Sequence, residues 1–259
     1  MTKNTNLKKY GLLGKNINYS FSKKYFTNKF NEEKRFDCKY ENYDINSIEE
    51  FKRIISDHPI PNGLNVTIPY KKSIIKFLDE LTEEAAEIQA VNTIVFKNSG
   101  KIIGHNTDYI GFKKALFEKI NSKPKRALIL GSGGASSAIA YVMNKIKCDF
   151  HIVSRKPKNS QLSYKSLSKE LIQEIDLIIN TTPVGTYPKI NESPPFPYDY
   201  INSSHFLFDL IYNPNETQFL KEGKLRNAQT CNGYSMLVYQ AEESWSLWNT
   251  WVKFQRFLI

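Results

Sequence analysis

Apolar and polar residues follow two different periods along the chain. In the first hundred residues, short apolar runs such as "YGLLG", "FDCKY" and "NVTIP" alternate with stretches whose apolar residues recur at helical spacing. The later runs "RALIL", "DFHIVSR", "DLIINTT" and "HFLFDLIY" each contain at least three apolar residues close together. Strands that alternate with helices along the chain are typical of parallel sheets covered on both faces. The pattern therefore predicts an α/β fold.

Several elements can be placed more closely. The segments "NTIVFK" and "KIIGHN", joined by Asn98-Ser99-Gly100, predict a β-hairpin, because asparagine and glycine tolerate the positive φ angles of tight turns. Helices are expected from Asp108 to about Ile120, from the cluster "GSGGASS" to about Ile146, and over "MLVYQAEESWSLWNTWV". The chain contains no internal repeat or low-complexity segment.

The stretch "NVTIPYKK", residues 65–72, combines a β-branched strand with polar residues and two lysines. Side chains alternate across a strand, so Val66 and Ile68 are expected on a buried face and Asn65 and Thr67 on the opposite one. A proline at position 69 suits the first position of a helix, which would place Lys71 in a first helical turn. A solvated surface lysine is the plain alternative there.

Composition limits the class of protein. With 259 residues, 41% hydrophobic and 24% charged, the chain is expected to form one or two folded domains. Neither a membrane-spanning run nor a secretory signal is evident, so a cytoplasmic location is expected. Cys38, Cys148 and Cys231 are odd in number, far apart and without C-x-x-C spacing, which argues against a disulfide framework and a zinc site, and no metal is expected.

The net charge of +10 is compatible with nucleic acid, a small anionic ligand or a lysine-rich surface. The lysines are scattered and no nucleic-acid motif accompanies them, which favours a small anion and no nucleic-acid or membrane partner.

The segment "RALILGSGGASSAIAYVMNKI" has the order strand, glycine turn, helix that binds dinucleotides. Gly131 would make the tight turn and Gly133 would admit a pyrophosphate to the helix start, although Ser136 occupies the third small position. The next strand ends in Ser154, Arg155 and Lys156 without an acid, which favours the 2′-phosphate of NADP over NAD. The candidate cofactor-binding residues here are Gly131, Ser132, Gly133, Gly134, Ala135, Ser154, Arg155 and Lys156.

Individually, the other polar residues have ordinary explanations as turns, caps or polar positions on amphipathic helices. Together, the ordered segments "GLLGKNINYSFS", "NVTIPYKK", "AVNTI", "GHNTD", "GSGGAS", "INTTPVG", "DLIYNPNETQFL" and "GYSMLVYQ" resemble the shikimate dehydrogenase family over nearly the whole chain. The resemblance implies a two-domain α/β fold with the active site in a cleft. Residues 1–105, completed by 236–259, would form the substrate domain, and residues 106–235 an NADP-binding Rossmann domain.

The resemblance also implies residue roles. Lys71 and Asp108 would be the catalytic pair, and Ser20, Ser22, Asn65, Thr67, Asn92, Tyr212 and Gln240 would bind substrate. Thr181, in the segment "NTTPVGTYP" that resembles the one beside the nicotinamide ring, and Gly233 would complete the cofactor site. A lysine with an ordinary pKa of about 10.4 is protonated at pH 7, so it suits a proton donor in ketone reduction.

The chain departs from the family pattern in three places. Lys23, Lys24 and Phe26 stand where the family usually has a proline and often a histidine. Tyr234 and Ser235 place larger side chains in a segment that is usually glycine-rich. Residues 154–156 replace the usual phosphate clamp. The expected reaction is NADPH-dependent, reversible reduction of 3-dehydroshikimate by a monomer or homodimer. The alternatives are a dehydrogenase acting on quinate or using NAD, a catalytically silent NADP-binding regulator, and a basic nucleic-acid-binding protein.

Overall fold

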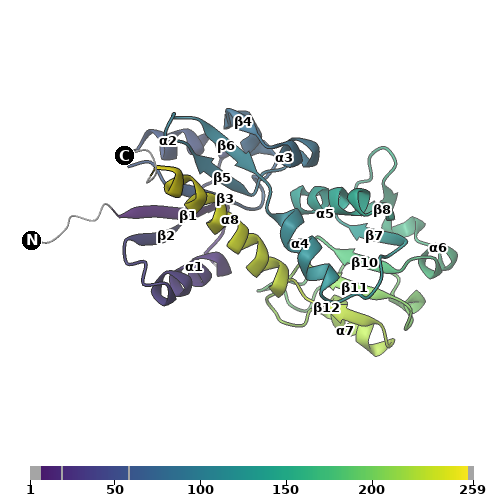
Figure 1. Cartoon of the computed structure of the whole chain (residues 1–259). Coiled ribbons are helices and arrows are strands. Elements are labelled where there is room, and N and C mark those ends of the chain that lie inside the picture. Colours follow the sequence, from purple (N-terminus) through teal and green to yellow (C-terminus); the bar gives the residue numbers. More distant parts are fainter. Residues whose placement is uncertain (1–6, 19, 58, 256–259) are drawn as a thin grey trace, which may run out of the picture. The chain divides into compact units, whose positions relative to one another are not determined.

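The computed structural model describes residues 7–18, 20–57 and 59–255, the last six by their backbone alone. The chain divides into two compact units (Figure 1). The first unit comprises residues 1–107 and 241–259, and the second comprises residues 108–240. The predicted boundaries near Asn106 and Ser235 lie a few residues from these divisions, and the functions predicted for the two domains stay predictions.

The first unit contains a mixed sheet with strand order β2-β1-β3-β5-β6-β4. Its strands are β1 (Lys8–Gly14), β2 (Cys38–Asp44), β3 (Gly63–Val66), β4 (Glu80–Leu81), β5 (Thr93–Phe96) and β6 (Ile102–His105). Strand β1 pairs in parallel with β2 and β3, whereas β5 is antiparallel to both β3 and β6. The predicted hairpin is therefore confirmed as β5 and β6, with Gly100 at a φ of +83° in its turn.

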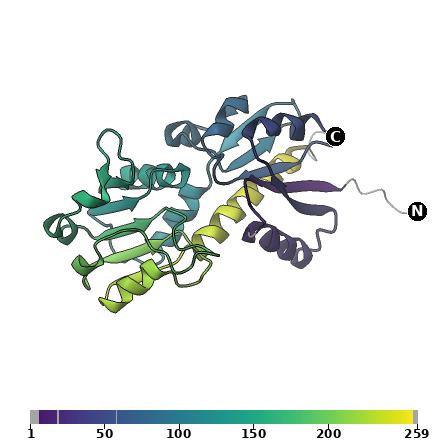
Figure 2. The ribbon, with the colours of Figure 1, turned by 180° about the vertical axis from the view of Figure 1, so that it is seen from behind.

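Helices cover this sheet from several parts of the chain. They are α1 (Phe21–Glu32), α2 (Phe51–Ser56), α3 (Glu83–Ile88), the 3-10 helices η1 (Ile48–Glu50) and η2 (Ser73–Phe77), and the later part of α8 (Tyr234–Gln255). Trp245 and Trp248 of α8 join Tyr10 and Phe26 in one core cluster. The indole of Trp248 donates to the carbonyl of Ile94 at 3.0 Å. The last helix thus completes the core of the first unit, and it is the yellow helix in Figure 2.

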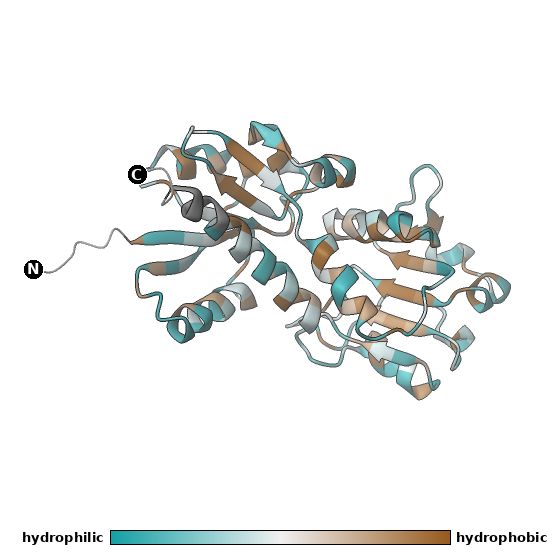
Figure 3. Ribbon diagram, viewed as in Figure 1, coloured by the Kyte–Doolittle hydropathy of each residue, from teal (hydrophilic) through white to brown (hydrophobic). Residues whose placement is uncertain are grey.

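The second unit is built on a sheet whose neighbouring strands are all parallel, in the order β12-β11-β10-β7-β8-β9. The strands are β7 (Arg126–Leu130), β8 (Asp149–Ser154), β9 (Leu162–Ser163), β10 (Leu177–Asn180), β11 (Phe206–Asp209) and β12 (Gln229–Cys231). The central strands are almost uniformly hydrophobic in Figure 3. The expected α/β architecture with two domains is confirmed; the short strands β9 and β12 were not predicted.

Helices cover both faces of this sheet. One core cluster joins α4 (Asp108–Phe117) and α5 (Gly134–Lys145) to it, and another joins α6 (Lys169–Gln173) and α7 (Gln218–Leu225) to the other face. Two 3-10 helices, η3 (Tyr164–Ser166) and η4 (Tyr198–Tyr200), lie in the connections. Within the part of the chain that is described, no helix is long and apolar enough to cross a bilayer.

Two predictions for residues 65–72 are wrong. Strand β3 ends at Val66, and Ile68, expected on the buried face, is 58% exposed. A turn closed by a bond from Tyr70 N to Thr67 O, at 2.9 Å, ends the strand, and the buried ring of Tyr70 faces the core instead. Lys71 lies in this turn and not in a helix, because the next helix begins only at Ser73 and is a 3-10 helix.

Candidate active site

The two candidate carboxylate-binding serines lie at the start of α1. Ser20 is the N-cap of this helix, and its hydroxyl accepts from the backbone N–H of Ser22 at 3.4 Å. Burial raises the pKa of Tyr40, and a hydrogen bond from Ser22 opposes this rise. The ring of Tyr40 stacks on Phe26 with centroids 4.5 Å apart. Phe26 is therefore a core residue that supports the serine-bearing turn.

Asn65 lies in a buried polar network and is only 5% exposed. Its side-chain oxygen accepts from the Tyr40 hydroxyl at 2.8 Å. Its amide nitrogen donates to the hydroxyl of Ser244 at 2.9 Å and to that of Thr93 at 3.2 Å. Partners from β2, β5 and α8 thus fix the orientation of this candidate substrate-binding amide.

Asn92 fixes the segment that leads into α4. Its side-chain oxygen accepts from Thr107 N at 2.6 Å, and its amide donates to the Thr107 hydroxyl at 3.0 Å. Thr107 directly precedes Asp108, the buried first residue of α4. On the other side of Asn92, the N–H of Val91 donates to the carbonyl oxygen of Lys71 at 2.7 Å. Asn92 thus lies between the backbone of Lys71 and the residue before Asp108.

Thr67 lies just beyond the end of β3 and is partly buried. Its N–H donates to the carbonyl of Leu13 at 2.9 Å, so the end of β1 holds it in place. A side chain on Gly14 would meet the methyl group of Thr67 at 2.6 Å. Ser20, Ser22, Asn65, Thr67, Lys71 and Asn92 all belong to the first unit.

Gln240 lies beside α4 within the second unit. A Cβ on Gly111 would be 3.0 Å from the Cβ of Gln240 and 2.7 Å from the carbonyl oxygen of Met236. Asp108 is three residues before Gly111 and shares its face of the helix. The close approach at Gly111 therefore places Gln240 on the same face of α4 as Asp108.

A bulky residue at this contact is expected to separate α4 from α8. We expect Gly111→Val to lower the free energy of unfolding by about 1–3 kcal/mol, because overpacking displaces the backbone of α8. Thermal or denaturant unfolding measures the effect, and Lys113→Val, at an exposed position of the same helix, is the matched control. Equal stability of the two variants would contradict the close packing at Gly111.

The glycine turn after β7 has the geometry that a dinucleotide requires. Gly131 has a φ of +117°, and a Cβ there would lie 2.5 Å from the hydroxyl of Thr181. A Cβ on Gly133, the N-cap of α5, would meet no atom within 4 Å. Open space thus borders the first turn of a 12-residue helix whose free N–H groups suit an anion. These residues fit a dinucleotide pyrophosphate.

Ser154 connects this turn with the basic segment after β8. Its hydroxyl lies 3.3 Å from that of Ser132 and accepts from the N–H of Lys156 at 3.2 Å. Arg155 and Lys156 are exposed at the carboxyl end of the strand. Ser136, at the third small position, is buried at 1% exposure, in keeping with close helix–sheet packing. The two exposed basic side chains after β8 are suited to a second phosphate group, the 2′-phosphate of NADP.

Thr181 and Gly233 also take part in close backbone packing. The hydroxyl of Thr181 donates to the carbonyl of Leu130 at 2.7 Å, next to the glycine turn. A Cβ on Gly233 would lie 2.0 Å from the carbonyl oxygen of Leu210, so only glycine fits there. The N–H of Gly233 donates to the carbonyl of Ile211 at 3.0 Å, so Gly233 lies beside the residue that precedes Tyr212. Contact of these residues with a cofactor or substrate stays a prediction.

Asp209, the last residue of β11, is a buried acid that the sequence did not single out as a site residue. Burial raises its pKa from 3.8 to about 7, against hydrogen bonds from Thr217, the N–H of Ile211 and Asn180. The native state therefore binds more protons than the unfolded state between about pH 4 and 7, and stability falls as the pH rises through this window.

Replacing Asp209 by asparagine is expected to flatten this dependence. The difference between 3.8 and about 7 corresponds to at most about 4 kcal/mol. Denaturant unfolding of the wild type and of Asp209→Asn at pH 4.5 and 7.5 measures it. Parallel stability curves for the two proteins would show that Asp209 keeps an ordinary pKa.

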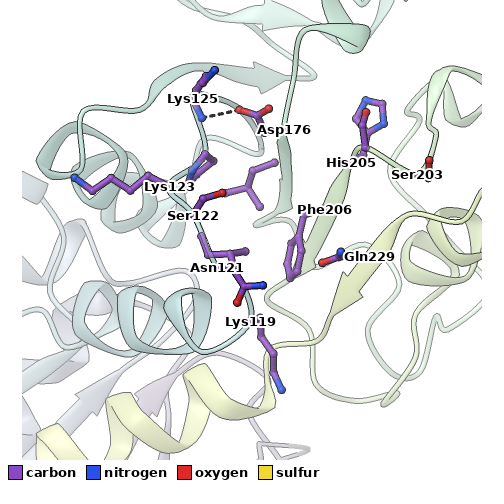
Figure 4. A pocket seen from close by; sticks show the side chains of 14 residues that line it. Lys119, Asn121, Ser122, Lys123, Lys125, Asp176, Ser203, His205, Phe206 and Gln229 are labelled. Atoms are coloured by element: carbon purple, nitrogen blue, oxygen red, sulfur yellow. Dashed lines mark hydrogen bonds between the residues drawn. The ribbon is translucent and has the colours of Figure 1, made fainter.

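A pocket of about 370 Å³ lies at the opposite edge of the second sheet from the glycine turn, where β7, β10, β11 and β12 begin. Lys119, Lys123 and Lys125 line it, but their side chains point in different directions (Figure 4). Asp176 accepts from Lys125 N at 2.6 Å and adds a negative charge. The residues that line this pocket include none of the predicted cofactor-binding residues, so the pocket is not the predicted cofactor site.

Sequence reasoning missed four members of the polar network in the first unit: Tyr40, Thr93, Thr107 and Ser244. Ser244 is fully buried, and its hydroxyl lies 2.8 Å from that of Thr93 and 3.2 Å from that of Thr107. The only signal in the sequence is a hydroxyl at helical spacing from the apolar residues Ala241 and Trp248. Among the described residues, no group of three or more His, Cys, Asp or Glu side chains is placed to hold a metal.

The chain is similar to known proteins over nearly its whole length. Residues 12–94 match the family model of the shikimate dehydrogenase substrate binding domain. The chain is 40% identical to a shikimate dehydrogenase (NADP(+)) of Methanococcus maripaludis over 95% of this chain and 93% of that protein. A crystal structure of shikimate dehydrogenase from Aquifex aeolicus matches with a TM-score of 0.84 and 34% identity over 94% of this chain and 92% of the other.

A second crystal structure, of a shikimate dehydrogenase in complex with NADP+, matches with a TM-score of 0.82 and 36% identity. It covers 95% of this chain and 91% of that one. Sequence identity of this extent over nearly the whole of both chains shows common descent. The chain belongs to the shikimate dehydrogenase family.

Proposed function

We propose that this protein reduces 3-dehydroshikimate to shikimate with NADPH, reversibly, as a step in the biosynthesis of chorismate and the aromatic amino acids. The observation that carries the proposal is the arrangement around Asn92, which connects the backbone of Lys71 to the segment before Asp108. Relatives named shikimate dehydrogenase (NADP(+)) support the choice of substrate and cofactor.

The chain supplies groups for binding and for proton transfer. The neutral hydroxyls of Ser20 and Ser22, with Tyr212, are proposed to bind the substrate carboxylate. The amides and hydroxyl of Asn65, Asn92, Gln240 and Thr67 are proposed to orient the ring hydroxyls. Neutral donors are sufficient for a carboxylate, which leaves the positive charge of Lys71 for the reacting oxygen.

Lys71 and Asp108 are the proposed catalytic pair. The ammonium of Lys71 donates a proton to the carbonyl oxygen of the substrate as negative charge develops there, and Asp108 orients the lysine and a ring hydroxyl. Bound NADPH supplies the hydride. The reverse reaction needs the neutral lysine, so oxidation of shikimate is expected to improve at higher pH.

The cofactor preference is proposed to come from Arg155 and Lys156. We expect Arg155→Ala to raise the KM for NADPH at least tenfold, because a charged hydrogen bond contributes about 1.5–3 kcal/mol. The KM for NADH is expected to stay nearly constant. Lys158→Ala, at another exposed position of the same loop, is the control. An equal loss with NADH and NADPH would show that Arg155 does not contact the 2′-phosphate.

The proposed reaction is tested by the decrease in NADPH absorbance after 3-dehydroshikimate is added to the purified protein. The same assay with NADH and with quinate separates the proposal from a dehydrogenase with different substrate or cofactor preferences. Cofactor binding without turnover would identify a silent regulator instead. Salt-dependent binding to DNA would favour the nucleic-acid alternative. We propose that the protein acts in the cytoplasm as a monomer or homodimer, with no nucleic-acid or membrane partner.

A further inference from the structure

Asp209 lies at the point where two connecting segments of the second unit leave neighbouring strands. It is fully buried and is the last residue of β11, paired in register with Asn180, the last residue of β10. One segment, residues 181–188, follows Asn180 and contains Thr181. The other, residues 210–217, follows Asp209 and contains Tyr212.

The first segment is connected to Asp209 through Asn180. The amide of Asn180 donates to Oδ1 of Asp209 at 3.0 Å. The side-chain oxygen of Asn180 accepts from the N–H of Thr182 at 3.0 Å and from its hydroxyl at 2.7 Å. The N–H of Val184 donates in turn to the Thr182 hydroxyl at 3.3 Å. A continuous chain of hydrogen bonds thus runs from Asp209 to Val184.

The second segment is held by Asp209 at both of its ends. The N–H of Ile211 donates to Oδ1 at 3.0 Å, and the hydroxyl of Thr217 donates to Oδ2 at 2.5 Å. Thr217 is also the N-cap of α7, accepting from the N–H of Leu220 at 3.3 Å. Tyr212 therefore lies between two anchor points on the same carboxylate.

The two segments also contact each other directly. The N–H of Tyr187 donates to the carbonyl of Asn213 at 3.1 Å, and the hydroxyl of Thr186 donates to the same oxygen at 3.2 Å. Any displacement of one segment therefore moves the other. One buried side chain thus accepts from Asn180, the residue before the first segment, and from Ile211 and Thr217 of the second segment.

Burying a carboxylate costs free energy because the group loses its hydration, whereas an apolar residue of similar size does not. The titratable group that interacts with Asp209 across this region is Tyr198, whose pKa is raised by burial and, to a lesser extent, by the charges of Glu222 and Asp209. Within the described part of the chain, no cation is among the groups that shift the pKa of Asp209, and the three donors are its polar partners. The free-energy cost of burying Asp209 is accounted for if its hydrogen bonds fix the positions of residues 181–188 and 210–217.

We propose that Asp209 is a positioning residue that holds the segment with Thr181 and the segment with Tyr212 in one fixed arrangement. This inference rests on the proposed function, in which the first segment flanks the nicotinamide and Tyr212 assists in binding the substrate. Asp209 itself is fully buried and acts through Asn180, Ile211 and Thr217.

The test compares Asp209→Ala with Asp209→Asn. Asparagine keeps one oxygen as the acceptor for Asn180 and Ile211, and its NH2 group can donate to the Thr217 hydroxyl. Alanine leaves all three donors without this partner. We expect Asp209→Ala to lower kcat/KM at least tenfold and Asp209→Asn to retain it within about threefold. Asp176→Ala is the matched control, because Asp176 accepts from Lys125 N and Arg126 N at the opposite edge of the same sheet.

Hydrogen exchange of backbone amides in the cofactor-free protein gives a readout that does not depend on activity. In Asp209→Ala, the amides of Thr182 and Ile211 are expected to exchange at least tenfold faster, while those of β7 stay protected. If Asp209→Ala does not fold, Asn180→Ala and Thr217→Val each remove the connection of Asp209 to one segment and are measured in its place. Asn180→Ala is expected to accelerate exchange at Thr182, and Thr217→Val at Ile211.

Unchanged exchange at both amides, or normal kcat/KM in a folded Asp209→Ala variant, would overturn the inference. A wild type that does not oxidise NADPH with 3-dehydroshikimate would refute the proposed function, and the exchange experiment would still decide whether Asp209 holds the two segments.

Discussion

Replacing Lys71 by methionine is expected to lower turnover of 3-dehydroshikimate by about 10²- to 10⁴-fold, the range that a positioned general acid contributes. Methionine keeps a long, unbranched side chain but carries no proton and no charge. The backbone contact between Lys71 and Val91 does not depend on the side chain, so the turn and its stability should be retained. NADPH absorbance at saturating substrate gives kcat directly.

The neighbouring Lys72→Met variant is the control for this experiment. Lys72 is more exposed than Lys71, and the substitution removes the same charge one residue away. Its turnover is expected to stay near that of the wild type. Normal turnover and an unchanged pH profile in Lys71→Met would show that another group donates the proton.

Adding one methyl group at Gly133 is expected to weaken NADP binding at least tenfold, about 1.4 kcal/mol, without unfolding the protein. A Cβ there meets no protein atom within 4 Å, and its φ of −83° is open to any residue. The methyl group would instead occupy the space through which the pyrophosphate approaches the start of α5. Isothermal titration of Gly133→Ala with NADP+ measures the loss.

Gly100→Ala provides the comparison, because a Cβ at Gly100 also enters open space. That glycine lies in the hairpin turn of the first unit, so NADP affinity should be unchanged despite some backbone strain at its φ of +83°. Equal NADP affinity of Gly133→Ala and the wild type would contradict the proposed place of the pyrophosphate.

Local signals in the sequence predicted much of the fold. The parallel sheet of the second unit was evident because its central strands are apolar on both faces and alternate with helices. The hairpin at Gly100 was evident because turn residues stand between two short strands. The glycine turn after β7 needed only one strand, one helix and the residues between them. The signal for each of these elements lies within a short stretch of sequence.

The errors occurred where the local pattern was ambiguous. Val66 and Ile68 alternate as a buried strand should, but the strand ends at Val66 and a turn that contains a proline follows it. The same proline was interpreted as the first residue of a helix, because proline suits both places. Periodicity cannot decide between a turn and a helix start over so few residues.

The supporting residues of the candidate site were beyond the reach of local reasoning. Ser244 bonds to Asn65 across 179 positions of the chain, and nothing near either residue indicates the other. The cost of burying Asp209 likewise depends on donors from a neighbouring strand and from the start of α7. Such partners emerge only from the packed structure.

The discontinuity of the first unit has a consequence for biosynthesis. Residues 108–240 form one uninterrupted stretch and can fold as soon as they leave the ribosome, since domains generally fold as units. The sheet of the first unit is synthesised earlier, but its core is completed only after α8 is made, because Trp248 bonds to Ile94 across 154 positions. During that interval the apolar surface around Tyr10 and Phe26 lacks its cover, and nascent chains stalled in this window would be candidates for chaperone binding.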